Sequence, residues 1–258
     1  MNTLTQNQLK HIRNLLQKKF REEKKKFFVE GIRGIEEALQ SDWEFEMLIA
    51  TEKNYSSDSG GKIFSVASKK CIPFFSTSEK EIAKLSDTES SQGIIAVIRQ
   101  KLSIINYQLS TLIIALDSIN DPGNLGTILR TCDWFGTDGV LLGKNCVELY
   151  NPKVVRASMG AIFHLPIVVN VDLENELPKL KGQKFQIAST SSHTKKSLFE
   201  ISIPKKSVII FGSEAHGISP SLEKISDIQF SIPKFGKAES LNVASACSSV
   251  LTAWKMQS

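Results

Sequence analysis

The feature that most constrains this sequence is a series of short apolar runs that alternate with segments of helical periodicity. In the second half of the chain the runs read TLIIALDSI, GVLLG, LPIVV, FQIAST and SVIIFGSE. A run that is apolar at every position is typical of a strand buried on both faces of a parallel sheet. Because helices between such strands cover both faces, the pattern predicts an α/β unit with a mainly parallel sheet.

The segments between these runs are predicted to be amphipathic helices. Residues 124–136 carry an apolar stripe at helical spacing, and Gly136 is placed to end that helix. At about 100° per residue, Arg130 falls on the face opposite the stripe, so it is not a core residue. Further helices are expected over 151–163 and 241–256.

Residues 1–105 are predicted to form a smaller α/β unit, followed by a larger unit over 106–258. Ser78 is a favourable N-cap for one of the helices of the smaller unit. The segment QKLSIINYQLS is expected to be the linker between the two units. The other expected elements are a basic helix over 6–22, a helix from Ile32 to Leu39, strands at FEMLIAT, CIPFFST and GIIAVIR, and a loop at YSSDSGG.

Positive charge is concentrated near the N-terminus. The formal net charge is +5, and residues 10–26 contain eight lysines and arginines against two glutamates. Such a run attracts a phosphate backbone, because binding releases condensed counterions. A solvated helix face explains the same run equally simply.

Several classes of protein are disfavoured by the sequence. The four cysteines form no CxxC pair and are expected to be reduced and mostly buried, and the scattered histidines predict no metal site. The longest apolar runs are too short to cross a bilayer, and the first residues do not read as a signal peptide, so a cytoplasmic location is expected.

Three polar or glycine-rich turns follow apolar strands: NDPGNLG, GSEAHGIS and IPKFGKAESLN. Ligands of open α/β sheets bind beyond the carboxyl ends of the strands, so these turns are candidates to line one site. None matches a GxGxxG fingerprint or a P-loop. The polar residues in or just after these turns also have ordinary explanations. Arg130 can be a surface arginine, Glu214 a carboxylate near a helix start, and Ser240 an N-cap.

Taken together, the three turns resemble the motifs of a known family. NLGTILR, from Asn124 to Arg130, is similar to N-x-G-x-x-x-R, while FGSEAHGIS and IPKFGKAESLNVASA are similar to the second and third motifs. Residues 110–258 therefore resemble the SpoU (TrmH-type) RNA 2′-O-ribose methyltransferases of the SPOUT class. Cys132, where the family often has alanine, and the order Ala244-Ser245-Ala246 depart from the pattern without touching its polar positions.

The resemblance implies an α/β-knot domain with a deep trefoil knot, a homodimer through that domain, and S-adenosylmethionine as cofactor. Arg130 is implied as the central catalytic residue, either holding a substrate phosphate or assisting loss of the 2′-hydroxyl proton. Residues implied to orient Arg130 and the ribose are Asn124, Glu214, Ser240 and Asn242; those implied to bind the cofactor, mainly through the backbone, are Gly212, Ile232, Leu241, Thr190 and Gly217.

The N-terminal unit resembles an L30e/L7Ae-like substrate-binding domain, on the segments KKKFFVEGIRGIEEAL and LSDTESSQGIIAVI. This implies an RNA partner, with 23S ribosomal RNA favoured. The alternatives are a tRNA 2′-O-ribose methyltransferase and a non-catalytic RNA-binding or ribosome-assembly factor. The residues expected to contact RNA are Lys18, Lys19, Arg21, Lys24, Lys25 and Arg33.

Overall fold

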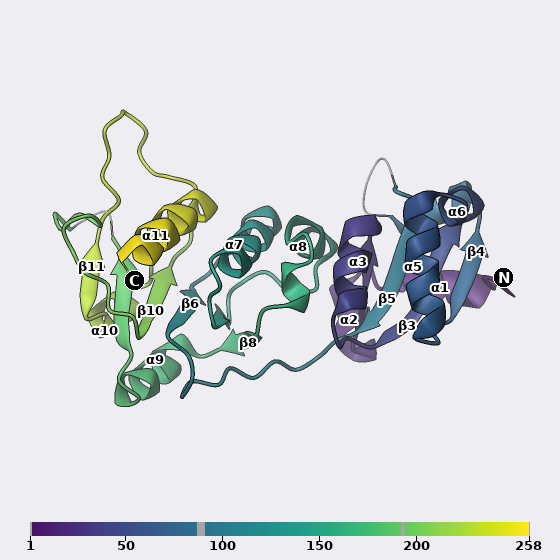
Figure 1. The fold of residues 1–258 in the computed structure, drawn as a ribbon. Coiled ribbons are helices and arrows are strands. Elements are labelled where there is room, and N and C mark those ends of the chain that lie inside the picture. The colour runs from purple at the N-terminus through teal and green to yellow at the C-terminus, as the bar shows by residue number, and fades with distance from the viewer. Residues whose placement is uncertain (1, 87–90, 192–193, 258) are drawn as a thin grey trace. The chain divides into compact units, whose positions relative to one another are not determined.

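The computed structural model describes residues 2–86, 91–191 and 194–257 and divides into two compact units (Figure 1). Unit 1 comprises Met1–Lys101 with Glu148–His164, and unit 2 comprises Leu102–Val147 with Leu165–Ser258. Residues 87–90, within the second segment that resembles a substrate-binding domain, lie outside the described residues. Unit 1 thus includes a segment that follows the first strands of unit 2 in the sequence.

Unit 2 is built on a parallel sheet, as the uninterrupted apolar runs predict. Its strand order is β11-β9-β10-β6-β7-β8, and every neighbouring pair is parallel. The predicted strands are confirmed, whereas the short and partly polar β11 was not predicted. The bounds are β6 Leu112–Leu116, β7 Gly139–Gly143, β8 Ile167–Val171, β9 Gln186–Thr190, β10 Ser207–Phe211 and β11 Ile228–Phe230.

Helices cover both faces of this sheet (Figure 1). On one face α7 (Pro122–Trp134) packs against α11 (Val243–Gln257). On the other, α9 (Leu173–Gly182) and α10 (Pro220–Ile225) bury leucines against the strands; neither helix was predicted. Cys132 and Cys247 are buried on α7 and α11, and the hydrogen-bonded Cys132 thiol together with burial raises the pKa of Cys247.

The predicted helix after β6 is confirmed, but it begins earlier than expected. Pro122 occupies its first turn, and the Asp121 side chain accepts a hydrogen bond from the Asn124 amide at 2.7 Å. Five of the seven residues of NDPGNLG are therefore helical. The helix ends at a Phe135 cap, and Gly136 follows with φ of 64°, which glycine adopts without strain.

Unit 1 contains a mixed sheet of order β1-β4-β3-β5-β2, in which β5 is antiparallel to both neighbours. Ser78 caps the helix after β4 as predicted: its side chain accepts from the Glu81 amide, and the Glu81 carboxylate accepts from the Ser78 amide. The elements are β1 Asn2–Thr3, α1 Gln6–Asn14, α2 Lys18–Lys24, β2 Lys26–Glu30, α3 Ile32–Gln40, β3 Phe45–Thr51, α4 Glu52–Tyr55, α5 Asp58–Lys69, β4 Phe74–Thr77, α6 Glu79–Leu85 and β5 Ile94–Arg99.

Two predictions for unit 1 are wrong. The loop expected at YSSDSGG is mostly helical, because α4 and α5, capped by the Thr51 and Ser57 side chains, leave only residues 56 and 57 between them. The single basic helix over 6–22 is two helices that break around Leu15. The Arg21 guanidinium donates to the Leu15 carbonyl at 2.7 Å and so satisfies an acceptor left by the break.

The segment Glu148–His164 packs within unit 1. Its Tyr150 and Phe163 rings join Phe27 and Trp43 in an aromatic cluster, with centroids 4.6 Å apart for Phe27–Tyr150 and 5.4 Å for Trp43–Phe163. The helix predicted over 151–163 is interrupted, since α8 (Pro152–Ala157) and the 3-10 turn Ala161–Phe163 flank Gly160 at φ of 100°. Within the described residues, no helix is long and apolar enough to cross a membrane.

Candidate active site

Residues from all three sequence motifs meet in unit 2. Asn124 lies in the first turn of α7, Glu214 in the turn after β10, and Asn242 immediately before α11. Because β6, β10 and β11 run parallel, the segments after them leave the same edge of the sheet. The prediction that these turns line one site is supported by side-chain contacts.

The three side chains form a closed hydrogen-bond cluster. Glu214 Oε1 accepts from Asn124 Nδ2 at 2.9 Å, from Asn242 Nδ2 at 2.6 Å and from the Val243 amide at 3.3 Å. Asn242 Nδ2 also donates to Asn124 Oδ1 at 2.9 Å. Glu214 Oε2 has no hydrogen-bond partner among the described residues, so one carboxylate oxygen is free to meet a ligand.

A tight turn holds Glu214 in place. The Gly217 amide donates to the Ser213 carbonyl at 2.8 Å, and Gly217 has φ of 69°. A Cβ on Gly212 would lie 2.1 Å from the Gly217 carbonyl oxygen. Glycine is therefore required at 212 because the turn closes on its own backbone, whatever part it has in holding a cofactor.

Asn242 caps the last helix, so the ordinary explanation of Ser240 as its N-cap is wrong. Asn242 Oδ1 accepts from the Ala244 amide at 3.0 Å and the Ser245 amide at 3.4 Å. Ser240 is exposed and, in the described part of the chain, makes no hydrogen bond. One asparagine therefore organises the helix start with its oxygen and the Glu214 cluster with its amide nitrogen.

Arg130 lies apart from this cluster. It follows Asn124 by six residues on α7, which places it about 9 Å along the axis and about 120° around it. Its side chain is exposed and has no hydrogen bond or ion pair to another described residue. The structure thus groups three of the five predicted catalytic residues and leaves Arg130 and Ser240 outside.

The residues expected to hold the cofactor border the same edge. Thr190 ends β9 and is half-buried, Ile232 is half-buried, and Leu241 is 51% exposed. Among the described residues, no main-chain group of 232–241 donates or accepts a hydrogen bond. Free N–H and C=O groups of this kind fit the main-chain recognition of adenine that the resemblance implies. No group of three or more metal-ligating side chains occurs within the described residues.

The residues expected to contact RNA are exposed in unit 1, with one correction. Lys18 pairs with Glu22 at 3.7 Å and Lys24 with Glu23 at 2.9 Å, leaving Lys19, Lys25 and Arg33 without an ion pair inside the described ranges. Arg21 is only 2% exposed, because its Nε donates to Glu148 at 2.9 Å and its second terminal nitrogen pairs with the same carboxylate. It therefore cannot bind phosphate without breaking this pair.

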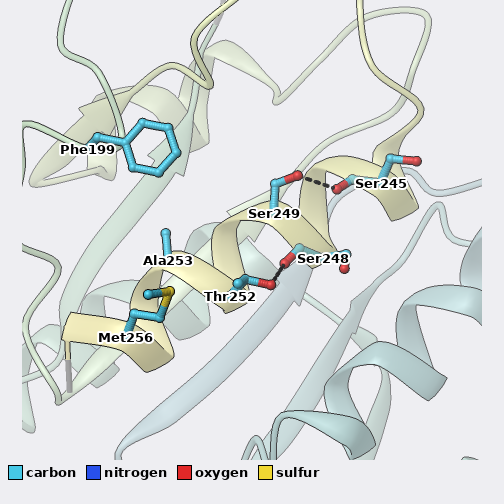
Figure 2. Close-up of a pocket in the computed structure, with 7 residues that line it drawn as sticks. All are labelled: Phe199, Ser245, Ser248, Ser249, Thr252, Ala253 and Met256. Atoms are coloured by element: carbon cyan, nitrogen blue, oxygen red, sulfur yellow. Dashed lines mark hydrogen bonds between the residues drawn. The ribbon is translucent and has the colours of Figure 1, made fainter.

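Sequence reasoning also missed an open groove along α11, of about 490 Å³ (Figure 2). Figure 2 shows the Phe199 ring across from the face of α11 that carries Ala253 and Met256. Small polar residues complete the lining: Ser245, Ser248, Ser249 and Thr252. Phe199 is 69% exposed and Met256 84% exposed, so two large apolar side chains border the groove at the surface.

The fold and the cluster define a two-unit α/β protein with a polar site at the carboxyl edge of a parallel sheet. Residues 111–252 match the SpoU rRNA Methylase family, and residues 6–96 match the MRM3-like substrate binding domain. The chain belongs to the SpoU rRNA methylase family. The membership suggested by the three motifs is confirmed, as is the resemblance of the N-terminal unit to a substrate-binding domain.

Known relatives span nearly the whole chain. The 23S rRNA (guanosine(2553)-2′-O)-methyltransferase RlmP of Bacillus subtilis is 32% identical over 92% of each protein. The 23S rRNA (uridine(2479)-2′-O)-methyltransferase of Streptomyces viridochromogenes is 26% identical over 87% of this chain and 80% of its own length. The AdoMet-bound rRNA methyltransferase structure from Sinorhizobium meliloti, 26% identical, superposes with a TM-score of 0.86 over 99% of this chain and 97% of its own.

Proposed function

We propose that this protein transfers a methyl group from S-adenosylmethionine to a ribose 2′-hydroxyl in structured RNA, with 23S ribosomal RNA as the substrate. The observation that carries the proposal is the Asn124–Glu214–Asn242 cluster, built from three motifs distant in the sequence. The two relatives above, named as 23S rRNA methyltransferases, support the substrate. A ribosomal substrate also agrees with the expected cytoplasmic location.

The loop 232–241 and Thr190 are proposed to bind the cofactor. The unpaired main-chain groups of the loop can read an adenine edge, and the Thr190 hydroxyl offers a further donor beside them. When bound, S-adenosylmethionine supplies a methyl group activated on a sulfonium. The family resemblance further implies that the C-terminal chain threads through a loop to form a deep trefoil knot.

The cluster is proposed to orient the ribose. Glu214 Oε2 can accept a hydrogen bond from a ribose hydroxyl, while Oε1 stays fixed by the two amides. Alignment of oxygen, methyl carbon and sulfur contributes much of the acceleration in such a transfer. The proposed part of Arg130 is to hold a substrate phosphate, because a guanidinium has a planar fork of donors and no acceptor.

A homodimer through unit 2 is proposed as the working state. The groove on α11 is bordered by exposed Phe199 and Met256, and Trp134 at the end of the neighbouring α7 is 84% exposed. Arg130 also lies away from the cluster on its own chain, and in a dimer the Arg130 of a second copy could approach the cluster instead. Light scattering at micromolar concentration should give twice the chain mass, and a monomeric mass would remove this part of the proposal.

Asn242 offers a sharp test of the site, because its two side-chain atoms have different partners. Asn242→Asp keeps an oxygen for the cap of α11 but places a carboxylate against Glu214. We expect Asn242→Asp to stay folded and to lose at least about a hundredfold in single-turnover methylation of an unmodified 23S rRNA transcript. Asn170→Asp, at an exposed asparagine of β8, is the matched control and should keep full activity.

The alternatives give different results in the same assay. Methylation of tRNA transcripts but not of 23S rRNA would reassign the substrate. RNA binding without methylation by the wild-type protein, in the presence of S-adenosylmethionine, would favour a non-catalytic assembly factor. Mapping the methylated nucleotide in the 23S transcript would then identify the target.

A further inference from the structure

The loop between β11 and α11 carries the most exposed aromatic ring of the described chain. Phe235 is 95% exposed, and all residues from Lys234 to Asn242 are exposed. In Figure 1 this loop extends well beyond the rest of unit 2. A phenylalanine that is almost fully exposed gains no stability from packing within its own chain. Its exposure therefore indicates contact with an external partner.

Both ends of the loop are fixed. At the start, the Ser231 amide donates to the Lys196 carbonyl at 2.8 Å, and Ser231 forms a parallel bridge with Ser197. At the end, Asn242 is held by Glu214 and Asn124. The loop therefore presents Phe235 from anchors that include the catalytic cluster itself.

The charge around Phe235 is positive. Lys234 and Lys237 flank it in the loop, and Lys195 and Lys196 lie directly before Ser197, which forms the isolated bridge to Ser231 at the loop start. None of these four exposed lysines forms an ion pair within the described chain, and Glu239 is the loop's acidic residue. An aromatic ring among lysines is the combination that binds single-stranded nucleic acid, through stacking on bases and attraction to phosphates.

We infer that Phe235 stacks on an unpaired base beside the target ribose, while Lys234 and Lys237 bind the adjoining phosphates. This inference rests on the proposed function and adds a contact to its substrate. Stacking on phenylalanine is tolerant of base identity, so the loop selects an unpaired, accessible nucleotide rather than a particular base. The substrate class is thus RNA whose target lies in a loop or bulge.

The test compares Phe235→Ala, Phe235→Tyr and a Lys234→Gln/Lys237→Gln double variant in the full chain. Leu109→Ala removes another exposed apolar side chain, 80% exposed and outside the loop, as the matched control. Binding is measured by anisotropy with a labelled 12-nucleotide single-stranded oligoribonucleotide and with the same strand in a duplex. We expect Phe235→Ala to weaken single-strand binding at least about fivefold, whereas Phe235→Tyr should keep the wild-type affinity because its ring can still stack. Neither variant should change the affinity for the duplex.

The lysine variant should weaken binding to both RNAs and reduce the salt dependence of each. Calorimetry with S-adenosylmethionine alone and light scattering complete the design. Wild-type single-strand affinity in Phe235→Ala would overturn the inference. So would a loss of cofactor affinity, which would assign the ring to the cofactor, or a change in oligomeric mass, which would assign it to a second copy. Because binding is read without methyl transfer, failure of the proposed activity would leave these results interpretable.

Discussion

The α2 region of unit 1 and the α7 region of unit 2 each present one arginine in a helix, in opposite surroundings. Arg21 is buried, donating to the Leu15 carbonyl and to the Glu148 carboxylate. Arg130 is exposed and, across the described residues, has no partner. A guanidinium fully satisfied by its own chain serves the fold, whereas an exposed and unpaired one is available to a substrate.

The largest expected effect is on chemistry, at Arg130. Arg130→Ala should lower single-turnover methylation by at least about 10²- to 10³-fold, because a phosphate contact made in the transition state is lost. Arg130→Lys should not restore activity, since lysine lacks the planar fork. The free energy of unfolding should change by no more than about 0.5 kcal/mol, as for other exposed substitutions.

Calorimetry with S-adenosylmethionine separates the possible roles of Arg130. Cofactor affinity should be retained, because the proposed site is formed by β9 and the loop after β11. Near-normal turnover in either variant would contradict the catalytic role. Loss of cofactor binding by a folded variant would move Arg130 into the cofactor site.

The next effect is on stability, at Arg21. Arg21→Ala should lower the free energy of unfolding by about 3–5 kcal/mol, because it leaves the mostly buried Glu148 carboxylate without its partner. The double variant Arg21→Met/Glu148→Leu should recover most of that loss. Urea unfolding measures both, with Arg33→Ala as an exposed control; equal losses for Arg21→Ala and Arg33→Ala would show that the buried pair is unimportant.

The same contrast explains what the sequence could predict. The apolar runs and the periodicity of residues 124–136 predicted the parallel sheet and α7, because these signals are local. The break at Leu15 and the burial of Arg21 depend on Glu148, 127 residues away, so the basic run was read as one exposed helix. The helices α9 and α10 and strand β11 were missed; β11 has only three residues and includes a glutamine.

At the site, sequence order identified the motifs but not their internal geometry. Asn124, Glu214 and Asn242 were predicted and lie together. Arg130 was predicted with them, although six helical residues separate it from Asn124 and place it on another side of α7. The alternative explanation of Ser240 as a helix cap rested on the good N-cap propensity of serine, but Asn242 accepts the hydrogen bonds of the first turn. Phe235 was missed because only its near-complete exposure separates it from an ordinary apolar residue.

A smaller effect concerns RNA binding by the lysines around Arg21. It should differ between the lysines that form an ion pair and those that do not. Lys19→Gln/Lys25→Gln should reduce the salt dependence of RNA binding by about one unit of slope per lysine, because both cations are free within the described chain. Lys18→Gln/Lys24→Gln should reduce it less, since Glu22 and Glu23 already offset those charges. Unchanged affinity and slope in both variants would identify the run as a solvated face.

The smallest expected effect compares the two units at alkaline pH. Burial raises the pKa of Tyr150 in unit 1 to about 12, and burial with the nearby Glu176 carboxylate raises that of Tyr107 in unit 2 to about 12. An unfolded tyrosine has a pKa of about 10, so between these values the unfolded chain binds fewer protons. Stability should therefore fall as pH rises from about 10 towards 12.

Substituting each tyrosine by phenylalanine isolates its contribution to the loss of stability at alkaline pH. Tyr150→Phe loses a hydrogen bond to the Lys101 carbonyl at 3.1 Å, a cost that is nearly independent of pH below 10. Near pH 11 the gap between wild type and Tyr150→Phe should shrink by about 1 kcal/mol relative to pH 8, measured by urea unfolding. Tyr107→Phe should show a smaller change, because Tyr107 is less buried than Tyr150 and solvent screens it more. A pH-independent gap for Tyr150→Phe would mean that the hydroxyl ionises in the folded unit as easily as in water, and the enclosed surroundings assigned to unit 1 around Tyr150 would be wrong.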